Sequence, residues 1–250
     1  MTTFSLKLIA IISMLIDHIT AVFVPTDSMY YLIGRSIGRL AFPIFAFLIV
    51  EGFYHTSNVK NYLKRLGIFA LLSEIPFDLA FYNQKFYNNA FEWSNIKSDL
   101  PKMFSDNEVF YTLINRFMAH QNIFFTLFLG LLAIYLINMA EKKNMNNMFY
   151  TNLINAAITI GFSFVAAFLR TDYSLLGILT IVAFYLFRGS KPLLAIALVI
   201  LSGGNVIQAL SAAAIIPIIF YNGKKGKSIK YFFYVFYPAH LLILYIIQII

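Results

Sequence analysis

The chain has 250 residues, of which 60% are hydrophobic and only 12% are charged, and its mean hydropathy is +0.75. A soluble domain of this size could not bury so much apolar surface, so the composition excludes a soluble protein and indicates an integral membrane protein. The net charge of +8 comes from basic residues in short loops between apolar runs, where they set membrane topology, and we find no nucleic-acid-binding motif. The absence of cysteine excludes disulfides and thiol chemistry.

The apolar runs predict transmembrane helices, because backbone polar groups in lipid must be satisfied within their own segment. The expected spans are residues 6–24, 31–53, 61–82, 120–140, 151–169, 173–188, 192–204, 205–221 and 231–249. The first span lacks a small-residue cleavage site and is predicted to be retained. The seventh is too short to cross alone, since about 20 residues are needed. The predicted fold is therefore an all-α polytopic bundle of about nine segments, forming one domain over residues 1–250.

Basic residues in alternate loops predict the topology. They form four groups: Lys60, Lys64 and Arg65; Lys142 and Lys143; Arg188 and Lys191; and Lys224, Lys225, Lys227 and Lys230. Positive charge favours the cytoplasmic side, so we expect a cytoplasmic N-terminus in the cytoplasmic (inner) membrane. Residues 192–221 must then return to the side they left, either as two short helices broken at Gly203-Gly204 or as a re-entrant hairpin. The polar insertion at about 83–119 is expected to be extracytoplasmic.

Ionisable side chains interrupt several of the predicted spans. The stretch "MLIDHITAVF" carries Asp17 and His18. At 1.5 Å per residue, the side chains nearest mid-depth lie about 14–21 Å from the cytoplasmic helix ends. They are His18, Arg39, Glu74, Gln208 and His240, with Asp17 and Asp78 close to the same layer. Because charges are costly in lipid and usually functional there, this shared depth predicts one site inside the bundle.

Each of these residues also has a structural interpretation. Arg39 paired with Asp17 or Glu74 would hold helices together, since buried charges persist only when paired. His240, in "YPAHLLI", could be a packing residue beside Pro238, and Gln208 could form an interhelical hydrogen bond. Interfacial placement would explain Glu51 and His55 at the end of the second span. The small-residue spacing of Gly34 and Gly38 predicts close packing of that span.

The chemistry favoured by this set is general base catalysis by His18. A neutral imidazole can take a proton from an amine or hydroxyl when a neighbour sets its tautomer. Adjacent helical residues point about 100° apart, so Asp17 and His18 are not expected to pair, and Glu74 or Arg39 is the expected neighbour. The same set would also serve a proton relay in a transporter. No metal site is predicted, because the histidines are scattered and no H-E-x-x-H motif is present.

Several longer strings carry a family resemblance. They are "IAIISMLIDHI", "IGRLAFPIFAFLIVEGFYHTSNVKNYLKRL", "LLSEIPFDLAF", "QNIFFTLFLGLL", "DYSLLGIL" and "FYNGKKG" followed by "KYFFYVFYPAHLLILYII". Together they resemble the TraX family, whose founding members are associated with N-terminal acetylation of conjugative pilin. The resemblance implies a polytopic acetyltransferase, related to membrane acyltransferases that use cytoplasmic acetyl-CoA. Those relatives have an essential histidine in the first span and an arginine in the second, which match His18 and Arg39.

From the residues and the resemblance together we expect three sets of site residues. The catalytic set is His18, Asp17, Arg39 and Glu74; the substrate-binding set is Glu51, His55, Asp78, Gln208 and His240; and the set for the phosphates of acetyl-CoA is Lys60, Lys64, Arg65, Lys224, Lys225 and Lys227. The basic residues would equally serve as solvated topology signals.

The expected reaction is acetyl transfer from acetyl-CoA to an amine or hydroxyl of a protein, glycan or lipid acceptor in the membrane or envelope. His18 would deprotonate the acceptor while Arg39 steadies the carbonyl oxygen, by direct transfer or through an acetyl-histidine. Two alternatives remain open: a proton-coupled transporter and a non-catalytic factor for pilus or envelope assembly.

Overall fold

A computed structural model describes residues 1–81, 102, 105–108, 119–143, 147–203, 206–227 and 230–250. Its named helices are α1 (Thr3–Phe23), α2 (Met29–Gly38), α3 (Ala41–His55), α4 (Val59–Phe81), α7 (Ile123–Lys143), α8 (Met148–Phe168), α9 (Ser174–Leu186), α10 (Lys191–Leu201), α11 (Val206–Ala209), the 3₁₀ helix η1 (Leu210–Ala214), α12 (Ile215–Ile219) and α13 (Lys230–Ile249). Over these ranges there is no β-strand, only an isolated bridge between Gln121 and Thr171. The predicted all-α class is confirmed.

Among the described residues, five helical stretches are long and apolar enough to cross a membrane: Thr3–Phe23, Met29–His55 (α2 and α3 taken together), Ile123–Lys143, Met148–Phe168 and Tyr231–Gln248. Helix α4 has the length, 23 residues, but carries charged side chains along it. Its crossing, and the total of about nine segments, therefore remain predictions. Most of the predicted insertion at 83–119 lies outside the described residues.

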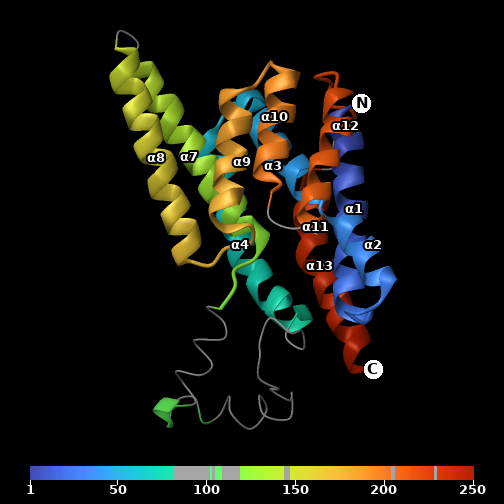
Figure 1. Cartoon of the computed structure of the whole chain (residues 1–250). Coiled ribbons are helices and arrows are strands. Elements are labelled where there is room, and N and C mark those ends of the chain that lie inside the picture. The colour runs from blue at the N-terminus through green and yellow to red at the C-terminus, as the bar shows by residue number, and fades with distance from the viewer. Residues whose placement is uncertain (82–101, 103–104, 109–118, 144–146, 204–205, 228–229) are drawn as a thin grey trace.

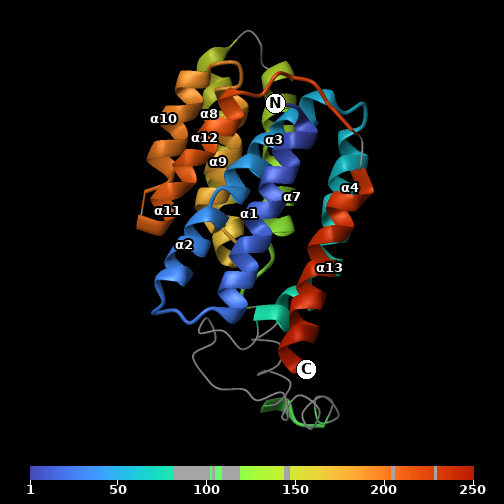
Figure 2. The same cartoon turned by 90° about the vertical axis from the view of Figure 1, so that its right-hand side faces the viewer.

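The helices form a bundle whose N-terminus and C-terminus lie at opposite ends (Figure 1). The helix ends that flank the basic loops, between α3 and α4, α7 and α8, α9 and α10, and α12 and α13, all lie at the end that holds the N-terminus. The end of α4 and the start of α7, which flank the predicted insertion, lie at the other end together with the C-terminus (Figure 2). The helix ends next to the four basic groups thus lie together at one end of the bundle, which we call the basic end.

The second predicted span is interrupted, which the hydropathy pattern did not predict. Helix α2 ends at Gly38, α3 begins at Ala41, and Arg39 lies at the break. Pro43 has no N–H to donate to the carbonyl of Arg39, so the helical hydrogen-bond pattern is weakest there. Helix α2 packs closely on α1: a Cβ on Gly38 would lie 2.1 Å from Asp17 Oδ1. The predicted close packing of this small-residue face is confirmed.

Residues 191–219 leave the basic end of the bundle and return to it (Figure 2). Helix α10 has 11 residues, about 16 Å, and α12 packs against it on the way back. The buried hydroxyls of Ser202 and Ser211 share a hydrogen bond of 2.6 Å that joins the two arms. Helix α10 ends at Leu201, close to the predicted break at Gly203, while Gly204 lies outside the described residues. Both predicted arrangements return to the side they left, and the choice between two short helices and a re-entrant hairpin remains a prediction.

The best-buried apolar side chains lie where α3, α7 and α9 meet. Fully buried residues there include Ile44, Ile134, Ile137 and Ile181. Helix α8 is peripheral and exposes large apolar side chains such as Phe164 and Phe168. An exposed apolar face of this kind is typical of a helix in contact with lipid.

Candidate functional site

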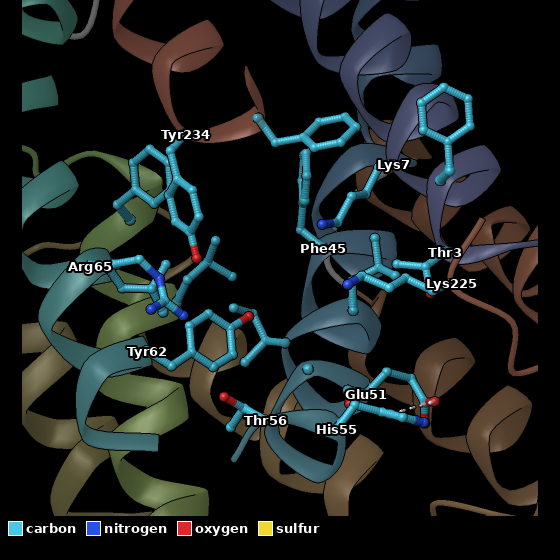
Figure 3. Close-up of a pocket in the computed structure, with 18 of the residues that line it drawn as sticks. Thr3, Lys7, Phe45, Glu51, His55, Thr56, Tyr62, Arg65, Lys225 and Tyr234 are labelled. Atoms are coloured by element: carbon cyan, nitrogen blue, oxygen red, sulfur yellow. Dashed lines mark hydrogen bonds and ion pairs between the residues drawn. The ribbon is translucent and has the colours of Figure 1, made fainter. Parts of the chain in front are cut away.

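A cavity of about 460 Å³ opens at the basic end of the bundle. The helices around it are α1, α3, α4, α7 and α13, together with the loop before α13. Figure 3 shows Tyr62, Arg65 and Tyr234 along one wall, with Lys7 and Lys225 across from them. The lining also includes Lys227, while its apolar part contains Phe45, Leu48, Ile49, Phe124 and Leu127. The cavity therefore combines a cationic side with an apolar interior.

The loop that carries two of the cations is fixed to the start of α1. The backbone N–H groups of Thr3 and Phe4, in the first turn of α1, donate hydrogen bonds to the carbonyls of Lys224 (2.9 Å) and Lys225 (3.2 Å). Donors at a helix N-terminus have no partner within the helix, so this loop satisfies them. Gly226 has φ of +69°, which favours glycine, and a Cβ there would lie 2.7 Å from Thr2 Oγ1. The backbone thus holds the loop beside the cavity.

Aromatic rings and one ion pair support the cavity wall. The Lys7 ammonium lies 4.8 Å from the ring centroid of Phe233, and the Arg65 guanidinium 5.5 Å from that of Tyr62. Both distances suit a cation–π contact. On α3, Glu51 accepts a 2.8 Å hydrogen bond from Arg188 Nε. Glu51 is buried by this pair and, with the exposed His55, lines the cavity.

Tyr221, at the edge of the cavity, lies in the loop before α13 and outside the helices. The Tyr221 hydroxyl shares a hydrogen bond of 3.1 Å with Thr3 Oγ1. Burial raises the pKa of Tyr221 above its ordinary value. This side chain is therefore a neutral hydrogen-bonding group at neutral pH.

At its inner end the cavity is lined by Met14 and Tyr237, close to a pair of histidines. His18 Nδ1 and His240 Nε2 are 2.7 Å apart, and His240 Nδ1 lies 2.8 Å from the carbonyl of Phe236. The Tyr237 ring centroid is 6.0 Å from that of His18. His18 does not itself line the cavity, but Met14 precedes it by one helical turn on α1 and faces the same side. The histidine pair thus lies directly beyond the inner end.

A second group surrounds Asp17. Arg35 Nη1 donates to Asp17 Oδ2 at 2.9 Å, and Arg39 Nη2 lies 3.8 Å from Asp17 Oδ1. Arg39 Nη1 also donates to the hydroxyl of Tyr173 at 3.3 Å, and that ring stacks on Phe42 with centroids 3.9 Å apart. The group therefore joins α1 and the α2–α3 break to the start of α9.

A third group lies between α4 and the start of α7. The side-chain and backbone N–H groups of Asn122 both donate to Glu74 Oε2. The side-chain amide also donates to the carbonyl of Ala70 at 2.8 Å, while Asn122 Oδ1 accepts from Phe124 N at 3.0 Å and caps α7. Within the described ranges, neither carboxylate oxygen of the buried Asp78 has a hydrogen-bond partner.

A comparison with protein families identifies the family of this chain. The family model described as TraX protein matches residues 3–96 and 107–248. This chain belongs to the TraX family. It is also similar to a probable fimbrial assembly protein FimC, serogroup H1, from Dichelobacter nodosus, with 29% identity over 97% of this chain and 94% of the relative. No solved structure matches the chain.

In this TraX family member the mid-depth residues form three groups, whereas the sequence predicted one site. The hydrogen-bond partner of His18 is His240, and not Glu74 or Arg39 as expected, although Arg39 lies within electrostatic range of His18. Asp17 pairs with arginines, which agrees with the prediction that it does not pair with His18. Gln208 is half-buried on α11, a helix that packs against α2 and η1. Helix rotation decides these partners, and hydropathy does not determine rotation.

Only some of the residues predicted to bind the phosphates of acetyl-CoA lie at the cavity. Arg65, Lys225 and Lys227 line the cavity. The remaining three, Lys60, Lys64 and Lys224, are exposed and do not line it. Lys64 and Arg65 are adjacent on α4 and are therefore rotated by about 100° relative to each other about the helix axis, so their side chains point in different directions.

Sequence reasoning missed several residues of these groups in the TraX chain, among them Arg35, Tyr173, Asn122 and Lys7. Arg35 precedes Arg39 by four residues, which places both on one face of a helix, and that spacing was a usable signal. Tyr173 and Asn122 act across helices far apart in the chain. Local sequence carries no comparable signal for them.

Proposed function

We propose that this TraX family protein is a membrane-embedded acetyltransferase that moves the acetyl group of acetyl-CoA to an amine or hydroxyl of an envelope acceptor. One observation carries the proposal: a cavity with a cationic side and an apolar interior ends beside the His18–His240 pair. Its volume of about 460 Å³ is in the range of small-molecule sites. The residue types along it match the successive parts of an acyl-CoA.

The donor would enter from the basic end. Lys7, Arg65, Lys225 and Lys227 offer cations for the phosphates, since charge-assisted hydrogen bonds to phosphate are strong. The apolar stretch between α3 and α7 suits the pantetheine arm. Lys7 and His18 are separated by 11 residues of α1, about 16 Å, a distance comparable with the reach of that arm. The thioester would then lie next to His18.

His18 would take a proton from the acceptor as its nitrogen or oxygen attacks the thioester carbonyl. The carbon–sulfur bond breaks, and the leaving thiolate accepts the proton from the imidazolium, giving CoA and the acetylated acceptor. The buried Nε–H of Arg39 has no partner among the described side chains, and Arg39 lies in electrostatic range of His18. A donor in that position would stabilise negative charge on the carbonyl oxygen.

The gathering of basic helix ends supports a cytoplasmic orientation for the end with the cavity. In that orientation α10 to α12 form a hairpin that re-enters on the cytoplasmic side, and about nine segments lie in the membrane. Acetyl-CoA would be drawn from the cytoplasm, and the acceptor would approach from the membrane or the opposite side.

The name of the Dichelobacter relative supports a pilus-related or envelope role, with a protein N-terminus, glycan or lipid as acceptor. The same name favours a second candidate, a non-catalytic assembly factor. The two candidates differ at His18, because an assembly factor does not need a base at that position.

The test uses the purified protein in nanodiscs with labelled acetyl-CoA, scored for release of CoA in the presence of candidate amine and hydroxyl acceptors. We expect His18→Ala to lower kcat by at least about 100-fold, the usual contribution of a general base. Equal CoA release by wild type and His18→Ala would contradict the proposal and leave the assembly factor. Substrate flux into proteoliposomes without CoA release would instead indicate transport.

A charge-reversal series tests the donor site. Lys225→Glu with Lys227→Glu should raise KM for acetyl-CoA by about 10-fold or more, because two attractive charges at the phosphates become repulsive. Lys142→Glu with Lys143→Glu makes the same charge change at the same end, on exposed residues that do not line the cavity. Equal effects of the two pairs would show that net charge, and not the cavity, governs binding.

A further inference from the structure

The two imidazoles and one carbonyl beyond the cavity form an ordered hydrogen-bond chain. It runs from His18 Nδ1 to His240 Nε2 over 2.7 Å and from His240 Nδ1 to the Phe236 carbonyl over 2.8 Å. The two ring planes differ by only 11°, with centroids 5.0 Å apart. With the nitrogens so close and the centroids this far apart, the rings meet edge to edge.

The Phe236 carbonyl, the last member of this hydrogen-bond chain, sets the direction of every hydrogen bond in it. A carbonyl oxygen only accepts, so His240 Nδ1 must carry the proton that it donates to Phe236. In a neutral imidazole the other nitrogen is an acceptor, so His240 Nε2 must accept a hydrogen bond. That donor is Nδ1–H of His18. The proton of neutral His18 is thereby assigned to Nδ1.

The remaining nitrogen, Nε2 of His18, then carries the lone pair. It has no hydrogen-bond partner in the described part of the chain. We infer that His240 is a positioning residue that fixes the Nδ1–H tautomer of His18 and leaves Nε2 as the nitrogen that accepts protons. The assignment deepens the proposed function, because it names the basic atom, but the tautomer itself does not depend on acetyl transfer.

The position of His240 is well determined by its surroundings. Its side chain is 5% exposed, and its ring lies 4.9 Å from that of Phe236 with planes 13° apart. Helix α13, which carries it, packs along α4. On the other side of His18, Phe81 meets the ring edge-on with centroids 5.1 Å apart. These contacts hold both rings, so loss of the His240 nitrogen should change the His18 tautomer more than its place.

The first experiment is ¹⁵N NMR of histidine-labelled full-length protein in nanodiscs at a pH where the rings are neutral. The chain has only four histidines, and His55→Gln and His120→Gln assign the other two signals. We expect His18 to show a protonated Nδ1 and an unprotonated Nε2, and His240→Phe to shift it toward a mixture of tautomers. A protonated Nε2 on His18 in the wild type, or an unchanged pattern in His240→Phe, would overturn the inference.

The second experiment compares His240→Phe with His240→Gln in the CoA-release assay. The amide oxygen of glutamine can accept where Nε2 of His240 accepts, and phenylalanine cannot. We expect kcat to fall by at least about 100-fold in His240→Phe, the scale of a general base in the wrong protonation form, with KM for acetyl-CoA unchanged. His240→Gln should recover most of that loss. Equal losses in the two variants would argue against tautomer control.

Failure of the acetyltransferase proposal can be distinguished from failure of the positioning role of His240. A wild type that releases no CoA but shows the Nδ1–H tautomer would reject the acetyltransferase and keep the positioning role of His240. Thermal unfolding of both His240 variants controls for folding, and His240→Gln with a native midpoint but the wrong His18 tautomer would overturn the inference.

Discussion

At the scale of single residues, partners decide what each buried charge does. Asp17 and Arg35 form a direct ion pair whose side chains are 14% and 12% exposed, with Arg39 close by. Asp78 is more deeply buried, yet its carboxyl oxygens have no hydrogen-bond partner within the described ranges. Removal of the carboxylate should therefore act differently at the two positions: at Asp17 it leaves the arginines without their counter-charge, and at Asp78 it removes a group whose desolvation is not compensated.

This contrast gives a prediction. Asp17→Asn leaves two largely buried guanidinium groups short of a counter-charge and should lower the free energy of unfolding by about 3 kcal/mol. Asp78→Asn replaces a buried carboxyl group without breaking a described contact, and the unfolding midpoint should stay unchanged or rise. Thermal unfolding in detergent measures both, with the exposed Asp27→Asn as control. A loss in Asp78→Asn as large as in Asp17→Asn would show that Asp78 has a cationic partner.

At the scale of elements, close approach of α1 and α2 brings the acid and the two arginines together. The approach depends on glycine, because Gly34 and Gly38 face Thr20 and Asp17 without a Cβ between them. The break between α2 and α3 then lets Arg39 reach both Asp17 and Tyr173. Hydropathy predicts a continuous helix over residues 31–53, and that prediction does not indicate that Arg39 contacts both Asp17 and Tyr173.

We therefore expect Gly38→Ala to separate α2 from α1 and to weaken the Asp17 ion pairs. Its Cβ would lie 2.1 Å from Asp17 Oδ1, and overpacking of this kind costs about 1–3 kcal/mol. Gly161→Ala is the matched control, because its Cβ would meet no atom within 4 Å. Unfolding midpoints compare the two. Similar stability of both variants would mean that α2 does not depend on close contact with α1.

At the scale of the whole molecule, the two ends of the bundle have different chemistry. The basic end holds the cavity, and the other end is joined by the segments at 119–122 and 170–172. There Gln121 N donates to the Arg170 carbonyl at 3.0 Å, and Asp172 N donates to the Gln121 carbonyl at 2.8 Å. His120 Nε2 lies 3.8 Å from Asp172 Oδ1 beside this junction. A titratable pair therefore helps to close the end opposite the cavity.

This pair predicts a pH dependence of global stability. Burial alone would lower the pKa of His120, but the neighbouring Asp172 carboxylate outweighs it and raises that pKa above its ordinary value. A raised folded-state pKa contributes stability that is fully present below the unfolded pKa of about 6.5 and is lost as pH rises through the folded value. The unfolding midpoint should thus fall across that window.

His120→Asn should flatten this dependence, and His55→Asn, which changes an exposed histidine at the basic end, should leave it intact. The measurement is the unfolding midpoint of the three proteins from pH 5 to pH 9. A slope that survives in His120→Asn would assign it to other groups, of which Glu74 is the nearest candidate.

Much of this architecture could be predicted from local sequence. Apolar runs indicated helices in a membrane, basic loops indicated which helix ends lie together, and the requirement for an even number of crossings anticipated that α10 and α12 leave and return to the same end. Asp17 and His18 were correctly expected to have different partners. The break at Arg39 and the anchoring of Glu74 by Asn122 were not predicted, because both depend on contacts between segments distant in the chain.

Sequence by itself determined the class of the protein, its family and the inventory of titratable groups, because hydropathy, charge and motif strings are properties of short stretches. Only the tertiary structure decided that His18 contacts His240, that Asp17 contacts Arg35, and that Arg65 lines the cavity while Lys64 does not. The reason is geometric. Each residue turns a helix by 100°, so partners depend on how every helix is rotated about its axis, and packing among all the helices determines that rotation.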